Sequence, residues 1–157
     1  MTDASVARAV YLETNFFIKA VEGTVEASIP PKKLIEVLRV RPGMAVTSEI
    51  TLAETLAPPR RADALPLHIK RRAYLDLIVW SGFVTLIPVS RDILIETADL
   101  RSVARLKLPD AIHLVSAIRG KCGYLVSDDG DFNKLPEGMA RVKPDENGID
   151  GLLRTLA

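Results

Sequence analysis

Residues 10–18 read VYLETNFFI, an apolar run that stops at Glu13-Thr14-Asn15 and resumes with two phenylalanines and an isoleucine. Residues 8–12 (RAVYL) have the pattern of a short buried strand, and residues 14–23 (TNFFIKAVEG) have that of a helix ended by glycine. A carboxylate at the end of a buried strand needs a partner. The stretch therefore predicts a strand–helix unit with an acid, Glu13, at its joint.

Strand and helix patterns alternate along the rest of the chain. Further strands are predicted at MAVTS (44–48), FVTLIPVS (83–90), GYLVS (123–127) and, as an edge strand, ARVKP (140–144). Further helices are predicted at PPKKLIEVLRV (30–40), SEITLAETLA (48–57), LHIKRRAYLDLIVWSG (67–82), RDILIETADLRSVARLKL (91–108), PDAIHLVSAIRG (109–120) and IDGLLRTLA (149–157). This alternation indicates a three-layer α/β/α sandwich with a central, mainly parallel sheet of four or five strands. The length of 157 residues fits a single domain, which we expect to span residues 1–157.

Composition narrows the class of protein. Apolar residues make up 48% of the chain and charged residues 26%, the balance of a globular protein, and a net charge of +1 neither demands nor excludes a nucleic-acid partner. Cys122 is the only cysteine, so no internal disulfide can form. The sequence has no signal-peptide pattern and no apolar run near the ~20 residues of a membrane span. We therefore expect a cytoplasmic protein without membrane contact.

Acidic residues fall where the predicted strands end. Glu13 closes the first strand, and Asp128, Asp129 and Asp131 follow the fourth. Glu54 lies in the helix after the second strand, and Asp110 opens the helix that leads into the fourth. Ligand sites of open parallel sheets form at this carboxyl edge. The acids are thus candidates for one common site.

Each acid also has an ordinary structural interpretation. Asp110 follows Pro109 in a first helical turn, where the helix dipole favours a carboxylate. The SDDGD segment (127–131) is typical turn chemistry. Glu54 and Glu49 both project toward the apolar side of their helix, and helix geometry alone does not separate them.

Convergence of the acids would require a counter-charge. Several carboxylates within ~4–6 Å of one another cannot all stay ionised without protons or cations. The sequence has no His/Cys cluster for zinc, and oxygen ligands favour Mg²⁺ or Mn²⁺. A bound ion of this kind would explain an acid at the end of the first strand.

Four segments in this order and spacing, VYLETNFFI, TSEITLAETL, LKLPDAIHLVSAI and YLVSDDGDF, resemble the signature segments of PIN domains, a family that includes the VapC-like toxins. The resemblance runs from about residue 10 to residue 132. It implies an α/β/α fold and a ribonuclease that uses Mg²⁺ or Mn²⁺. By position it assigns catalysis and metal binding to Glu13, Glu54, Asp110 and Asp129, with Asp131 as a further metal ligand and Asn15 and Ser127 in support. It thereby favours Glu54 over Glu49.

The first family acid is usually Asp, and here it is Glu13. The extra methylene moves the carboxylate outward against the octahedral geometry that Mg²⁺ prefers. Because the charge is kept, we expect metal binding to be retained. The predicted function is hydrolysis of RNA phosphodiesters, and the resemblance further implies a homodimer and, for toxin members, a small antitoxin protein.

Two alternatives remain at the level of sequence. One is a catalytically silent PIN-like module that binds RNA or protein. The other is a receiver-like Mg²⁺-binding signalling domain, which is disfavoured because Thr14 and Asn15 follow Glu13 where an acidic pair would be needed. The basic residues Arg60, Arg61, Lys70, Arg71 and Arg72 are interpreted either as a solvated surface or as a rim that contacts RNA phosphates. His68 and His113 are expected to be surface or packing residues.

Overall fold

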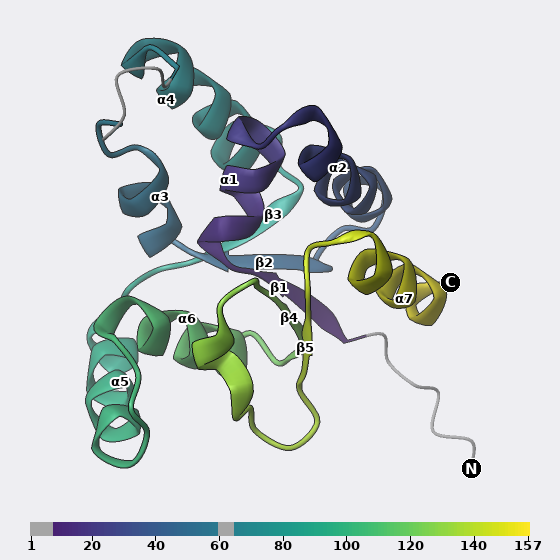
Figure 1. Cartoon of the computed structure of the whole chain (residues 1–157). Coiled ribbons are helices and arrows are strands. Elements are labelled where there is room, and N and C mark those ends of the chain that lie inside the picture. The colour runs from purple at the N-terminus through teal and green to yellow at the C-terminus, as the bar shows by residue number, and fades with distance from the viewer. Residues whose placement is uncertain (1–7, 60–64) are drawn as a thin grey trace.

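A five-stranded parallel sheet forms the centre of the molecule, and helices cover both of its faces (Figure 1). The computed structural model describes residues 8–59 and 65–157. The strands are β1 (Ala9–Leu12), β2 (Ala45–Ser48), β3 (Val84–Ile87), β4 (Cys122–Val126) and β5 (Ala140–Val142). The helices are α1 (Thr14–Glu22), α2 (Val25–Arg39), α3 (Ile50–Thr55), α4 (Leu67–Leu75), η1 (Asp76–Trp80), α5 (Arg91–Val103), α6 (Leu108–Arg119), η2 (Gly130–Asn133) and α7 (Glu146–Leu156). The predicted α/β/α architecture is confirmed.

The order of strands in the sheet is β3-β2-β1-β4-β5, and every neighbouring pair is parallel. β1 lies in the middle, with Leu12 paired to Val126 of β4. After β1, the chain adds β2 and β3 on one side of β1, and then β4 and β5 on the other side. The order therefore reverses between β1 and β4, the point where open α/β sheets form their ligand crevices. Receiver domains have the order 2-1-3-4-5, so this topology excludes the receiver-like alternative.

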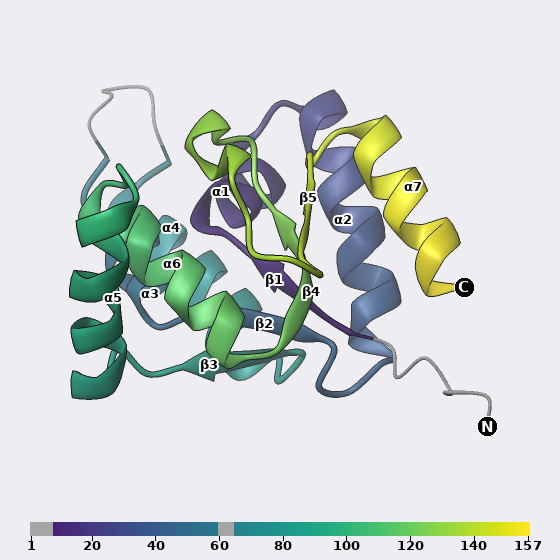
Figure 2. The same ribbon diagram turned by 90° about the horizontal axis from the view of Figure 1, so that it is seen from below.

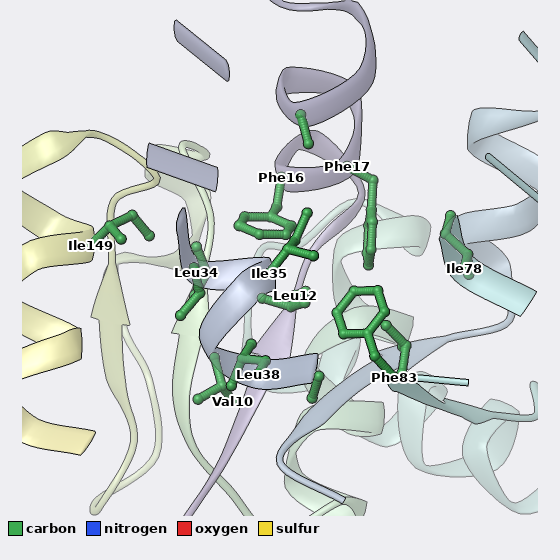
Figure 3. Close-up of a cluster of buried hydrophobic side chains, with 14 of the residues drawn as sticks. Val10, Leu12, Phe16, Phe17, Leu34, Ile35, Leu38, Ile78, Phe83 and Ile149 are labelled. Carbon is green, nitrogen blue, oxygen red and sulfur yellow. The ribbon is translucent and has the colours of Figure 1, made fainter. Parts of the chain in front are cut away.

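The larger core lies between the sheet and the helices α1, α2, α4 and α7. Strand alternation directs Val10 and Leu12 of β1 into this core and Tyr11 to the opposite face. Phe16 and Phe17 of α1 are completely buried there, and their rings meet edge to face (Figure 3). The apolar residues after Asn15 are thus the packing face of the first helix.

The second face of the sheet is covered by α5 and α6 (Figure 2). Leu114 and Ala117 of α6 pack on Tyr11 and Leu125, and Ile93 of α5 packs on the outer side of α6. α6 consequently packs against the sheet and against α5, which lies beside it in Figure 2. This burial fixes the helix that carries Asp110.

Several predicted boundaries differ from the structure. α2 begins at Val25, earlier than the predicted residue 30, because Thr24 caps it by accepting a hydrogen bond from the Ala27 amide. Pro30 and Pro31 then lie inside the helix. α5 ends at Val103 instead of continuing to residue 108. Residues 67–80 form one continuous helical segment, as expected, whose last turn is a π-helix with Ser81 N donating to Asp76 O.

Leu152 and Leu156 of α7 are buried against the larger core, with Leu153 packed beside them. In Figure 1 this carboxyl-terminal helix lies alongside α2. Within residues 8–59 and 65–157, no helix is long and apolar enough to cross a membrane.

Candidate metal centre

Glu13 follows the last residue of β1 and is the N-cap of α1. Only 4% of the residue is exposed, and its Oε2 accepts hydrogen bonds from Asn15 N at 3.3 Å and Ser127 Oγ at 3.2 Å. Burial raises the pKa of Glu13 above its ordinary value, although these hydrogen bonds and nearby His113 act against the rise. Hydrogen bonds therefore hold the Glu13 side chain in place, but its surroundings only partly compensate its negative charge.

Ser127 links two of the predicted acids. Its hydroxyl donates to Glu13 and accepts from the Asp129 amide at 2.9 Å. The link follows from the parallel pairing of β1 with β4, because both strands end at the same edge of the sheet. Asp129 in turn accepts a hydrogen bond from the Asp131 amide at 2.9 Å, which turns the chain into η2.

Three aspartates form the densest acidic cluster in the described part of the chain. One carboxylate oxygen from each of Asp110, Asp129 and Asp131 lies within 4.8 Å of the other two. Asp110 reaches the cluster from the first turn of α6. Burial raises the pKa of Asp110, and the negative charge of Asp129 raises it further. The cluster therefore combines oxygen donors with uncompensated negative charge.

Glu54 adjoins this cluster from α3. Its Oε1 accepts hydrogen bonds from Thr14 Oγ1 at 2.7 Å and from His113 Nε2 at 2.8 Å. Burial raises the pKa of Glu54, but these two hydrogen bonds outweigh it and hold the pKa below the ordinary value. Glu49, in contrast, makes no capping hydrogen bond through its side chain. Of these two glutamates, Glu54 is the one that faces the site, because its partner His113 also lies near Glu13.

His113 connects the glutamates to each other. Its Nε2 lies 2.8 Å from Glu54 Oε1 and 3.9 Å from Glu13 Oε1. Its Nδ1 lies 2.6 Å from the hydroxyl of Tyr11. Sequence reasoning had treated His113 as a surface or packing residue and had not considered the side chain of Thr14. The spacing of three residues between Asp110 and His113 places both on one side of a helix, and this signal could have identified the histidine.

The remaining predicted residues lie around this centre in different ways. Asn15 contacts Glu13 through its backbone amide, while its side chain is exposed. Asp128 points to Lys19 of α1, whose ammonium lies 2.7 Å from its carboxylate. Lys70 is buried and donates to the Ala57 carbonyl at 3.0 Å, so its ammonium is directed into the protein. Arg71 and Arg72 are exposed, and Arg60 and Arg61 lie outside the described residues.

The donor set suits a hard divalent cation. Carboxylate oxygens are the ligands that Mg²⁺ and Mn²⁺ favour. The nitrogen nearest to the acids, His113 Nε2, is engaged with a carboxylate. A cation between Asp110, Asp129 and Asp131 would supply the charge that their proximity requires.

A family model described as the PIN domain matches residues 10–138, the greater part of the sequence. The chain belongs to the PIN domain family. The match covers all of the acids described above and ends before β5. PIN domains are typically nucleases, so the acidic cluster lies in a fold that is associated with cleavage of nucleic acids.

Solved structures of other proteins share the fold of this chain. A toxin–antitoxin complex from Klebsiella pneumoniae contains a chain that is 29% identical, with a TM-score of 0.62, and the similarity covers 88% of this chain and 99% of that one. VapC20 from Mycobacterium tuberculosis, described as a toxin that cleaves the sarcin–ricin loop, is 18% identical (TM-score 0.62; 80% and 93% covered). VapBC2 from Rickettsia felis, bound to a promoter DNA fragment, is 17% identical (TM-score 0.62; 86% and 98% covered). The last two likenesses concern the PIN fold alone. None of the curated proteins compared with the chain matches it.

Proposed function

We propose that this PIN domain is a metal-dependent endoribonuclease that hydrolyses RNA phosphodiester bonds at the edge of the sheet between β1 and β4. The observation that carries the proposal is the approach of Asp110, Asp129 and Asp131 to within 4.8 Å of one another at the topological switch point. A cation-binding cluster at this position of a PIN fold is suited to phosphate chemistry. Asp110, Asp129 and Asp131 would hold the ion, with Glu13 and Glu54 beside them.

A bound Mg²⁺ or Mn²⁺ supplies positive charge for the phosphate and lowers the pKa of bound water. The chain's own residues prepare the site for it. Ser127 keeps Glu13 and Asp129 in register through its two hydrogen bonds. Thr14 and His113 hold one oxygen of Glu54. This arrangement orients the carboxylates before RNA arrives, so little reorganisation is needed during the reaction.

The test is cleavage of RNA with Mg²⁺ or Mn²⁺ by the wild type and by Asp110→Asn, Glu13→Asp and Asp99→Asn. We expect Asp110→Asn to abolish cleavage, because it removes a charge from the aspartate cluster. Glu13→Asp should preserve or increase cleavage, because it keeps the carboxylate charge and restores the aspartate that is usual at this position of PIN domains. Asp99, which is exposed on α5, is the matched control and should behave as wild type when replaced by Asn.

Chelation of the metal should stop cleavage, and added Mn²⁺ should restore it. Cleavage that persists in chelator, or in Asp110→Asn, would contradict the proposal. Binding of RNA without any cleavage by the wild type would instead support the silent PIN-like module.

We further propose that the chain is the toxin of a toxin–antitoxin pair and forms a homodimer. The Klebsiella complex supports the assignment to a toxin–antitoxin pair, because a chain within such an assembly is 29% identical over nearly its whole length. The homodimer is proposed from the family resemblance alone. Expression of the protein alone should arrest growth, and co-expression with the product of an adjacent small gene should relieve the arrest. Light scattering of the purified protein should give twice the mass of 17.2 kDa expected for one chain.

A further inference from the structure

Tyr11 and His113 form a buried pair directly behind the acids. Tyr11 is completely buried and His113 is 1% exposed. The phenol oxygen lies 2.6 Å from His113 Nδ1, and the other ring nitrogen, Nε2, lies 2.8 Å from Glu54 Oε1. The imidazole therefore spans the distance between the second face of the sheet and the rim of the metal centre.

The directions of these hydrogen bonds can be worked out from the partners of the Tyr11 hydroxyl and of the His113 ring. Ser48 N is a backbone donor and lies 3.1 Å from the Tyr11 oxygen, which must accept there. His113 Nδ1 lies 2.6 Å from the same oxygen, and Nε2 faces a Glu54 carboxylate oxygen, which can only accept, so the ring hydrogen is on Nε2 and the phenol hydrogen points to Nδ1. A neutral imidazole that accepts at Nδ1 carries its hydrogen on Nε2. His113 therefore donates to Glu54.

The recipient of this hydrogen bond is one particular oxygen of Glu54. Oε1 accepts from both His113 and Thr14, whereas no hydrogen bond to Oε2 is found among residues 8–59 and 65–157. The side chain is 33% exposed and projects from a helix of only six residues. Without partners, a glutamate in this position would sample several rotamers. The two hydrogen bonds fix Oε1 and leave Oε2 available.

We propose that His113 is a positioning residue that presents Glu54 to the divalent cation, and that Tyr11 holds His113 in the tautomer that can donate. This inference rests on the proposed function, in which Glu54 stands beside the ion. α6 carries both Asp110 and His113, so a single buried helix sets the places of two acids that come from different elements. A histidine with a merely structural role would leave cation affinity unchanged when replaced by an apolar residue of similar size.

The experiment is titration calorimetry with Mn²⁺ alone, on wild type and on His113→Leu, His113→Gln and His68→Leu. We expect His113→Leu to weaken Mn²⁺ binding by about 10- to 100-fold, the usual effect of losing a hydrogen bond to a metal-ligating residue. His113→Gln retains an N–H donor near Nε2 and should recover most of the affinity. His68, the other histidine of the chain and an exposed residue, is the matched control and should bind as wild type when replaced. Equal affinity of wild type and His113→Leu would overturn the inference.

The tautomer can be measured without metal or mutation. Nitrogen-15 NMR of the two imidazoles should show His113 protonated at Nε2 and unprotonated at Nδ1, and the opposite tautomer would overturn the inference. Tyr11→Phe, which supplies a second test if His113→Leu does not fold, should lower Mn²⁺ affinity in the same direction. Unchanged affinity and tautomer in Tyr11→Phe would also contradict it. Failure of wild type to bind Mn²⁺ would instead remove the metal centre itself, and with it the proposed function.

Discussion

At the scale of single residues, two effects raise the pKa of the Asp110 carboxyl group. Burial in the first turn of α6 raises its pKa, and the nearby charge of Asp129 raises it again. Because the folded-state pKa is above the ordinary value of 3.8, the folded protein binds the proton more tightly than the unfolded chain does. The resulting stabilisation is complete below pH 3.8 and is lost as the pH rises through the folded-state pKa.

Replacement of Asp110 by Asn should therefore raise the melting temperature of the metal-free protein at pH 7, because it removes a repelled carboxylate. The gain should shrink as the pH is lowered through the raised pKa of Asp110, because the wild-type carboxyl group then becomes protonated itself. Thermal denaturation in chelator, with Asp99→Asn as the control, measures both effects. A lower melting temperature of Asp110→Asn at pH 7 would contradict this interpretation.

Single residues also show what the sequence could and could not reveal about the site. Glu13, Asp110, Asp129 and Asp131 could be named as candidates because their places at strand and helix ends are visible in the pattern. The choice of Glu54 over Glu49 needed the family resemblance, since both project toward the apolar side of the helix predicted at residues 48–57. The role of Thr14 and His113 depends on where side chains from β1, α3 and α6 meet, and no local pattern encodes such a meeting.

At the scale of elements, the basic side chains of α4 lie in two different environments. Lys70 turns inward and caps the Ala57 carbonyl, which ties the start of α4 to the segment after α3. Arg71 and Arg72 face solvent, and Arg72 pairs with Asp76 one turn later at 3.3 Å. Exposed pairs of this kind contribute little to stability. The two arginines are therefore available for another role, and their contact with RNA remains a proposal.

Replacement of Arg71 and Arg72 by Ala should weaken RNA binding while leaving the fold intact. Each contact between a cation and a single-strand phosphate contributes about −0.7 to the slope of log affinity against log salt concentration. Loss of both should flatten the slope by up to about 1.4. Binding is best measured in an Asp110→Asn background, which prevents cleavage, with Lys32→Ala on α2 as the control. An unchanged slope would show that these arginines do not contact phosphates.

The boundaries of elements were predicted less well than their order. The prolines at positions 30 and 31 suggested a helix start, yet Thr24 caps α2 one and a half turns earlier. Pro30 and Pro31 lie inside α2, where each removes its amide from the hydrogen-bond ladder and crowds the carbonyl four residues earlier, so a helix start at these residues was the simpler expectation. The parallel direction of the strands, by contrast, follows from the crossovers that the alternation of strands and helices had indicated, whereas that alternation does not determine their order.

At the scale of the whole molecule, β5 and α7 extend the PIN domain beyond the family match. The match ends at residue 138, and α7 covers residues Glu146–Leu156. Ile149 and Leu152 of α7 nevertheless enter the same core as Phe16 and Leu34. Ile149 is seen at the edge of this core in Figure 3. The apolar residues near the carboxyl end had two possible partners in the sequence, this domain or another chain. They pack on this domain.

Leu152→Ala should accordingly lower the free energy of unfolding by about 2–5 kcal/mol, the usual loss for a buried leucine. Leu153, a neighbour that is only partly buried, provides the matched comparison, and Leu153→Ala should have a smaller effect. Urea denaturation followed by circular dichroism measures the difference. Equal losses for both variants would mean that Leu152 does not belong to the common core.

The switch point between β1 and β4 has a consequence for biosynthesis. The acids of the metal centre come from both halves of the chain, from Glu13 at the first strand to Asp131 after the fourth. A growing polypeptide cannot assemble the centre until nearly all of its residues have been made. A nascent chain that ends before Asp131 therefore lacks part of the site on which the proposed ribonuclease activity rests.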